Sequence, residues 1–253
     1  MFRPRIIPAL LLRNLGLVKS VGFKDYKYIG DPINAVKIFN DLKADELVFL
    51  DILASKEKRV ISLDFVLKVG DEANMPFSVG GGIRTILDIK SVLRAGAEKV
   101  VISTYAVEDP AFIRAAADEF GSSTITVCID VKKKILGKQQ VYIYGGTKST
   151  NLDPVWFAKK MEEMGAGELI INSIDRDGSM EGYDIELIKA VSDSVTLPVV
   201  ALGGAGKVED LNEAVQNGHA SAVAAGSMFV FHGPRRAVLI NYPQSEELKN
   251  IFK

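Results

Sequence analysis

The chain has 253 residues, of which 47% are hydrophobic, so it is long enough to bury a large core. Its 31 Lys and Arg residues nearly balance its 32 Asp and Glu residues, which gives no indication of a nucleic-acid or anionic-membrane partner. One cysteine, Cys128, excludes an internal disulfide framework and is typical of a reducing cytosol, so we expect a cytoplasmic protein. With only His219 and His232, and no Cys/His cluster, we expect no metal site and no cofactor.

The first apolar stretch, RIIPALLLRN at residues 5–14, could be a secretory signal, a core strand, or a catalytic strand that lacks its acid. Its apolar run is at the short limit for a signal, and no small-residue cleavage site follows. No run elsewhere approaches the roughly 20 apolar residues of a membrane span. We therefore interpret the stretch as a strand and expect no membrane association.

Short apolar runs then alternate with amphipathic helical patterns along the whole chain. The runs are continuously apolar, as expected of parallel strands covered on both faces, and they predict eight strands: IIPALLL, ELVFLDI, PFSVGGG, KVVIS, ITVCID, ELIINS, PVVALGG and SAVAAG. This order predicts an α/β fold, a (β/α)8 TIM barrel. Only KKKILGKQQVYIYGG breaks the rhythm, and its alternating part, 141–144, predicts a small hairpin inserted after the fifth strand.

The two halves of the sequence resemble each other. ADELVFLDI is echoed by AGELIINSI, and MPFSVGGGIR by LPVVALGGAG, in both cases 122 residues later. One shared offset indicates an internal repeat of half a barrel. No linker or composition shift separates the halves, so we expect residues 1–253 to form a single domain.

Ligand chemistry in such a barrel lies at the C-terminal strand ends. Glycines there let backbone N–H groups approach a phosphate, although they also serve tight turns. Two clusters occur, around Gly82 with Ser103 and around Gly204 with Gly226 and Ser227, and two such sites suit a substrate with a phosphate at each end. Among the acids, Asp130 closes the fifth strand and could work as a general acid or base. Asp51 and Asp177 could instead order loops.

Four charged residues stand at or near strand starts, at the opposite end of the barrel. They are Arg5, Glu46, Lys99 and Glu168. Barrel geometry makes them converge on one face. From the charges alone, a ring of salt bridges that closes the bottom of the barrel is the simpler interpretation.

The motifs RIIP, ADELVFLDI, VGGGIR, INSIDRDG, GYD and ALGGAG, with the strand that ends in Asp130, together resemble the cyclase subunit of imidazole glycerol phosphate synthase (HisF-like). The match runs in order over residues 3–231. The resemblance implies a lyase-type subunit of a glutamine amidotransferase. A HisH-like glutaminase docks on the N-terminal face, and ammonia passes up the barrel to a bis-phosphorylated substrate, on the way to histidine and purines.

The resemblance also implies a role for each matching position. Arg5, Glu46, Lys99 and Glu168 match the family's ammonia gate, which replaces the simpler interpretation above. Asp130 matches one of two catalytic aspartates, and Lys19 matches the lysine of the mobile first loop. Gly82, Gly178, Gly204 and Ser227 match the family's phosphate-contact positions. Together with Ser103, Asp177 and Gly226 from the strand-end analysis above, the expected phosphate and substrate contacts are Lys19, Gly82, Ser103, Asp177, Gly178, Gly204, Gly226 and Ser227.

Several positions depart from the family pattern. The second catalytic aspartate of the family falls at the end of the first strand, where this chain has Leu11, and leucine cannot carry a proton. Ser103, Asn172 and Leu202 stand where the family has asparagine, threonine and serine, and Gly226 reads as an insertion. The ending RRAVLINYPQ does not resemble the family's final helix.

These departures resemble a specialised branch of HisF-like proteins that is encoded with surface-polysaccharide genes. That branch delivers ammonia to a partner that makes acetamidino sugars. We therefore expect an ammonia-receiving subunit with weak cyclase activity. The first alternative is a working cyclase in histidine biosynthesis, with Asp130 sufficient or another group replacing the lost acid. The second is a non-catalytic scaffold that activates its glutaminase.

Overall fold

The computed structural model describes residues 3–134, 137–233 and 235–252. Eight parallel strands close into a barrel, in which β1 pairs with β4 and β12 and β10 pairs with β7. The predicted (β/α)8 barrel is therefore confirmed. Its strands are β1 (Arg5–Arg13), β4 (Leu47–Asp51), β5 (Phe77–Gly80), β6 (Lys99–Ile102), β7 (Ile125–Lys133), β10 (Glu168–Ser173), β11 (Val199–Leu202) and β12 (Ala222–Ala225).

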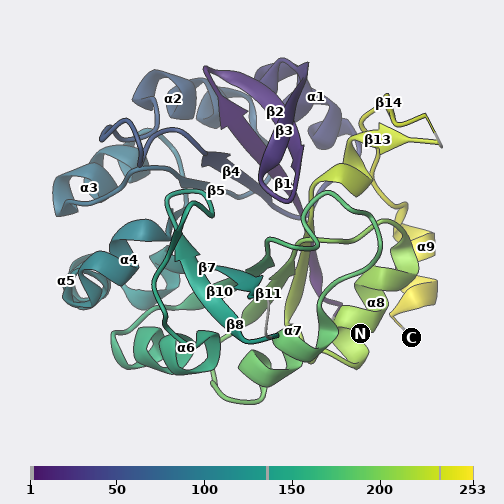
Figure 1. Cartoon of the computed structure of the whole chain (residues 1–253). Coiled ribbons are helices and arrows are strands. Elements are labelled where there is room, and N and C mark those ends of the chain that lie inside the picture. Colours follow the sequence, from purple (N-terminus) through teal and green to yellow (C-terminus); the bar gives the residue numbers. More distant parts are fainter. Residues whose placement is uncertain (1–2, 135–136, 234, 253) are drawn as a thin grey trace.

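Helices surround the ring of strands, as Figure 1 shows. They are α1 (Pro32–Asp41), α2 (Leu63–Glu72), α3 (Ile86–Arg94), α4 (Thr104–Glu108), α5 (Pro110–Phe120), α6 (Pro154–Glu163), α7 (Ile185–Ser192), α8 (Val208–Gln216) and α9 (Ser245–Ile251), with short 3₁₀ turns at Ser122–Thr124 and Ser227–Phe229. Local sequence sets their starts. Asp31 caps α1 by accepting a hydrogen bond from the Asn34 N–H, and Pro32 fills the first helical position. No helix of the described residues is long and apolar enough to cross a membrane.

Side chains of each strand alternate between two cores. On β7, Val127 and Ile129 pack outward in the shell shared with the helices, whereas Cys128 packs inward. The inner cluster is small and consists of Ile7, Ala9, Val48, Val101, Cys128, Ile170, Val200, Leu202, Ala222 and Ala224. The alternation fixes which residues face the barrel axis, because neighbours two apart on a strand share a face.

Three short hairpins extend the strand framework. The predicted insertion after the fifth barrel strand is confirmed: β8 (Gln139–Ile143) pairs antiparallel with β7 and with β9 (Lys148–Ser149). Positions 135 and 136 of that stretch lie outside the described residues. The hairpin of β2 (Gly16–Val21) and β3 (Lys24–Gly30) extends β1 and has no counterpart in our sequence predictions. The third joins β13 (Phe231–His232) to β14 (Ala237–Val238).

Candidate functional site

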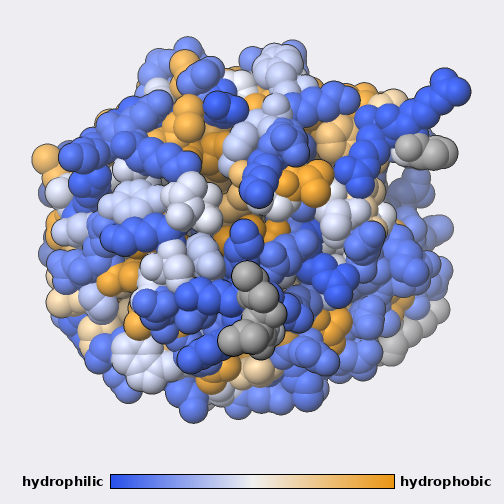
Figure 2. Space-filling view, in the orientation of Figure 1, coloured by the Kyte–Doolittle hydropathy of each residue, from blue (hydrophilic) through white to orange (hydrophobic). Residues whose placement is uncertain are grey.

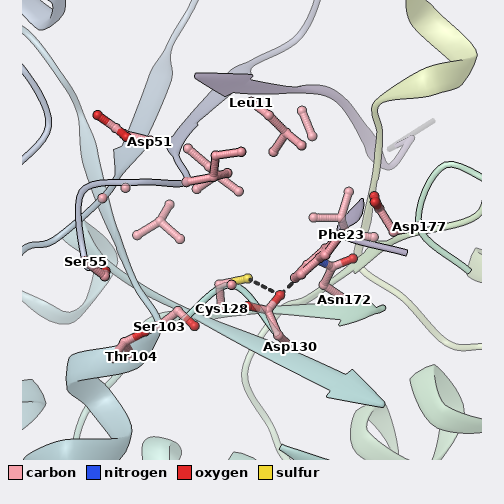
Figure 3. A pocket seen from close by; sticks show the side chains of 18 of the residues that line it. Leu11, Phe23, Asp51, Ser55, Ser103, Thr104, Cys128, Asp130, Asn172 and Asp177 are labelled. Carbon is pink, nitrogen blue, oxygen red and sulfur yellow. Dashed lines mark hydrogen bonds between the residues drawn. The ribbon is translucent and has the colours of Figure 1, made fainter. Parts of the chain in front are cut away.

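A cavity opens at the C-terminal ends of the barrel strands (Figure 3). The strand ends and following loops bring together residues that are far apart in the sequence. The cavity is lined by Leu11 and by every residue predicted for catalysis or phosphate contact. These residues are Lys19, Gly82, Ser103, Asp130, Asp177, Gly178, Gly204, Gly226 and Ser227. The surface around it is mainly hydrophilic, with separate apolar patches (Figure 2).

Asp130 lies buried at the wall of this cavity, near the C-terminal end of β7. Its Oδ1 accepts a hydrogen bond of 2.9 Å from Asn172 Nδ2, and Cys128 Sγ lies 3.9 Å away (Figure 3). Burial raises the pKa of the Asp130 carboxyl to about 7; the Asn172 hydrogen bond opposes the shift, and the negative charge of Asp177 adds to it. A carboxyl that is half-ionised near neutral pH is suited to both giving and taking a proton.

This pKa shift predicts a pH-dependent stability. Between pH 3.8 and about 7 the folded chain keeps a proton on Asp130 that the unfolded chain has lost. By linkage, the Asp130 contribution to the free energy of unfolding is fully present below about pH 4 and is lost as the pH rises to about 7. Denaturant unfolding of wild type and Asp130→Asn across this range measures the difference. Parallel curves for the two proteins would contradict the assignment.

Lys19 reaches the cavity from β2 rather than from an irregular loop. Its ammonium is buried and donates a hydrogen bond of 2.5 Å to the Ala9 carbonyl. Burial lowers the pKa of Lys19 to about 8, and the charge of Asp177 partly offsets this effect. A Cβ at Gly226 would lie 2.3 Å from Lys19 Nζ, so the glycine that reads as an insertion leaves the room that the ammonium occupies.

The turn at Asp177 and Gly178 holds the β2–β3 hairpin against the mouth. Ser20 Oγ donates to Asp177 Oδ2 over 2.8 Å, and the Gly22 N–H donates to the Asp177 carbonyl over 2.9 Å. Gly178 has a φ of +71°, and a Cβ there would lie 2.0 Å from the Ser20 carbonyl oxygen. Asp177 and Gly178 therefore have a loop-ordering role, which is compatible with the predicted substrate contact.

Asp51 also orders a loop. Its carboxylate pairs with Arg59 at 2.6 Å and accepts hydrogen bonds of 3.1 Å from the N–H groups of Leu53 and Ala54. Burial raises the pKa values of the Asp130 and Asp177 carboxyls at the mouth.

The β1 side chains that line the cavity, Ala9 and Leu11, are apolar. Leu11 pairs in register with Leu50 of β4 and Val18 of β2, and Leu202 also lines the cavity. Figure 3 shows Leu11 across the cavity from Asp130. The segment β1, RIIPALLLR, carries no acid at any position. A proton-transfer partner for Asp130 is therefore absent from this strand.

Sequence reasoning missed several residues of the mouth. Phe23 and Tyr26 line the cavity from the β2–β3 hairpin, and Tyr144 lines it from the segment after β8. Asn172 appears in the sequence analysis only as a departure from the family pattern, and its contact with Asp130 follows from the pairing of β10 with β7. No group of three or more Asp, Glu, His or Cys side chains is placed to hold a metal within the part of the chain that the structure describes.

At the other end of the barrel, the predicted charged residues form a closed network, which we name the charged ring (Arg5, Glu46, Lys99 and Glu168). The Arg5 guanidinium pairs with both glutamates. Lys99 Nζ lies 3.4 Å from Glu46 Oε1 and 3.2 Å from Glu168 Oε2. Two cations thus alternate with two anions at the bottom of the barrel, and the apolar inner cluster lies between this ring and the mouth.

These features define a (β/α)8-barrel protein with a ligand cavity at its mouth and a charged ring at the opposite end. Residues 5–234 match the family model described as histidine biosynthesis protein. The chain belongs to this family, in its HisF-like cyclase-subunit branch.

Three relatives show how close the match is. A protein of Leptospira interrogans named "Putative imidazole glycerol phosphate synthase subunit HisF" is 45% identical over 100% of both chains. A Pseudomonas aeruginosa protein with the same name but the symbol hisF2 is 45% identical over 98% of this chain and 99% of its own. The imidazole glycerol phosphate synthase subunit HisF of Alkaliphilus metalliredigens is 44% identical over 92% of each chain.

Proposed function

We propose that this chain is a HisF-type synthase subunit that receives ammonia from a partner glutaminase at its N-terminal face. The ammonia travels through the barrel to a phosphorylated substrate at the mouth. The observation that carries this proposal is the alignment of three features on one axis: the charged ring, the apolar inner cluster and the cavity with Asp130.

Each feature has a physical task in this scheme. An apolar bore disfavours charged species, because burying an unpaired ion costs far more than burying a small neutral molecule. Neutral ammonia therefore crosses it more readily than ammonium does. When ammonia adds to an electrophilic carbon, its nitrogen must lose a proton, and the Asp130 carboxylate can accept it. The glycine-rich loops and Lys19 supply N–H donors and positive charge for phosphate groups.

We further propose that the substrate belongs to a specialised sugar-amidination pathway and that cyclase activity is weak. Leu11 supports this proposal, because removing a general acid or base costs about 10²- to 10⁴-fold in rate. The second candidate is a working cyclase in histidine biosynthesis. The full-length similarity to relatives that carry the imidazole glycerol phosphate synthase name favours it.

Turnover of the histidine-pathway substrate separates the two candidates. The assay supplies purified protein with that substrate and an ammonium salt, so no glutaminase is required. We expect turnover to be lower by about 10²- to 10⁴-fold than that of a cyclase with both aspartates. Turnover at the level of such an enzyme would assign the chain to histidine biosynthesis and exclude the specialised role.

A further inference from the structure

Two hydroxyl side chains lie beside the charged ring, on strands between its members. Ser78 is on β5, between β4 and β6, and Thr126 is on β7, between β6 and β10. Thr126 is in register with Glu168 on one side and with Val101 on the other. It is two residues from Cys128, which packs in the inner cluster, so its side chain faces the barrel axis.

The two hydroxyls differ in their partners. Ser78 Oγ donates a hydrogen bond of 2.9 Å to Glu46 Oε1. Thr126 is 1% exposed, and its Oγ1 has no hydrogen-bond partner among the described residues. A buried polar atom without a partner costs free energy and native proteins keep few of them, so the Thr126 hydroxyl calls for an explanation, such as a small group bound to it.

The surroundings of Thr126 indicate the size and polarity of that group. Val101, in register with Thr126, is apolar, and so are Cys128 and Ile170, the next inward side chains toward the mouth on β7 and β10. Ala222 and Ala224 contribute small apolar side chains on the β12 side of the bore. A single neutral hydroxyl cannot compensate the desolvation of an ion. The fitting partner is therefore a small neutral molecule that forms hydrogen bonds.

We propose that the Thr126 hydroxyl binds the ammonia molecule that has just passed the charged ring. This inference rests on the proposed function and adds a binding site to it. Ammonia offers one lone pair and three N–H groups, so the hydroxyl can donate to the nitrogen or accept from it. Among the described residues, Thr126 Oγ1 is an unpartnered polar atom in register with Glu168 of the charged ring. It therefore lies where ammonia leaves the ion pairs and enters the apolar inner cluster.

Thr126→Val tests the site, because valine keeps nearly the same shape and removes the hydroxyl. The assembled complex receives glutamine labelled with ¹⁵N in its side-chain amide, together with unlabelled ammonium, and the ratio of ¹⁵N to ¹⁴N in the product is measured. We expect this ratio to fall by about 2- to 10-fold, the factor for one net hydrogen bond.

Thr126→Ser should restore the wild-type ratio, since it keeps the hydroxyl. Ser192→Ala is the matched control, because Ser192 Oγ is also buried without a partner but belongs to α7, outside the barrel. It should leave the ratio unchanged. A crystal structure of the wild type should show a water-sized molecule bonded to Thr126 Oγ1, and that of Thr126→Val should lack it.

The outcomes distinguish this inference from the proposed function. If the wild-type product is labelled from glutamine and Thr126→Val gives the same isotope ratio, the Thr126 site is overturned. The passage of ammonia through the barrel would then still stand. A wild-type product labelled only from bulk ammonium would overturn both.

Discussion

Replacing Leu11 by aspartate is expected to raise turnover of the histidine-pathway substrate by about 10²- to 10⁴-fold. Leu11 lines the mouth cavity together with Asp130, and the new carboxylate would be the one acid that β1 contributes to this wall. It would give Asp130 the second proton-transfer group that β1 lacks. The measurement is the steady-state rate with saturating ammonium salt.

Two further variants make the Leu11→Asp result specific. Leu11→Asn has nearly the same shape as Leu11→Asp but does not ionise, so it should show no gain. Adding Asp130→Asn to Leu11→Asp should abolish the gain in turnover, because the two-carboxylate mechanism needs both Asp130 and the new aspartate. Equal rates for Leu11→Asp and wild type would show that the residue at position 11 does not limit the chemistry.

Replacing Arg5 by alanine is expected to lower the free energy of unfolding and to break the transfer of glutamine nitrogen. Glu46 and Glu168 are 4% and 6% exposed, and without Arg5 they share only Lys99 as a cation. Breaking a fully buried ion pair costs about 3–5 kcal/mol. Because the Arg5 side chain is 34% exposed, we expect about 2–3 kcal/mol, measured by denaturant unfolding.

Arg3→Ala is the matched control for the charged ring. Arg3 has a similarly exposed side chain, at 32%, and pairs with Asp45 outside the ring at 2.6 Å. Its replacement should leave nitrogen transfer unchanged. Activity driven by saturating ammonium salt should survive in both variants, since that ammonia can enter from the mouth. Loss of transfer in Arg3→Ala to the same degree would contradict a specific role for the ring.

The barrel could be predicted from sequence because its strands are buried on both faces and give continuous apolar runs. All eight runs became barrel strands. The charged ring followed from the same prediction, since residues at the starts of neighbouring strands must meet at one end.

The β2–β3 hairpin escaped prediction for an equally physical reason. Every residue of β3, KDYKYIG, is exposed or half-buried, so the strand lacks the apolar run that marks a buried strand. The resemblance matched Lys19 to the lysine of a mobile first loop, whereas the structure places it on β2. Its contact with the Ala9 carbonyl and the room left by Gly226 depend on pairing between distant segments, which a sequence pattern does not report.

Contacts within the barrel were equally beyond the sequence. The pattern placed Asp130 at a strand end, but the hydrogen bond from Asn172 and the burial that raises its pKa come from the closed barrel. The same is true of Thr126, whose hydroxyl lies beside the ring without a partner in the described chain.

Movement of glutamine nitrogen along the barrel axis is tested most directly in the assembled complex. The complex receives amide-¹⁵N-glutamine in buffer with excess unlabelled ammonium, and mass spectrometry measures the isotope in the product. The account predicts a product that carries mainly ¹⁵N in the wild type and the isotope ratio of the bulk solution in Arg5→Ala. A wild-type product with the bulk ratio would contradict it.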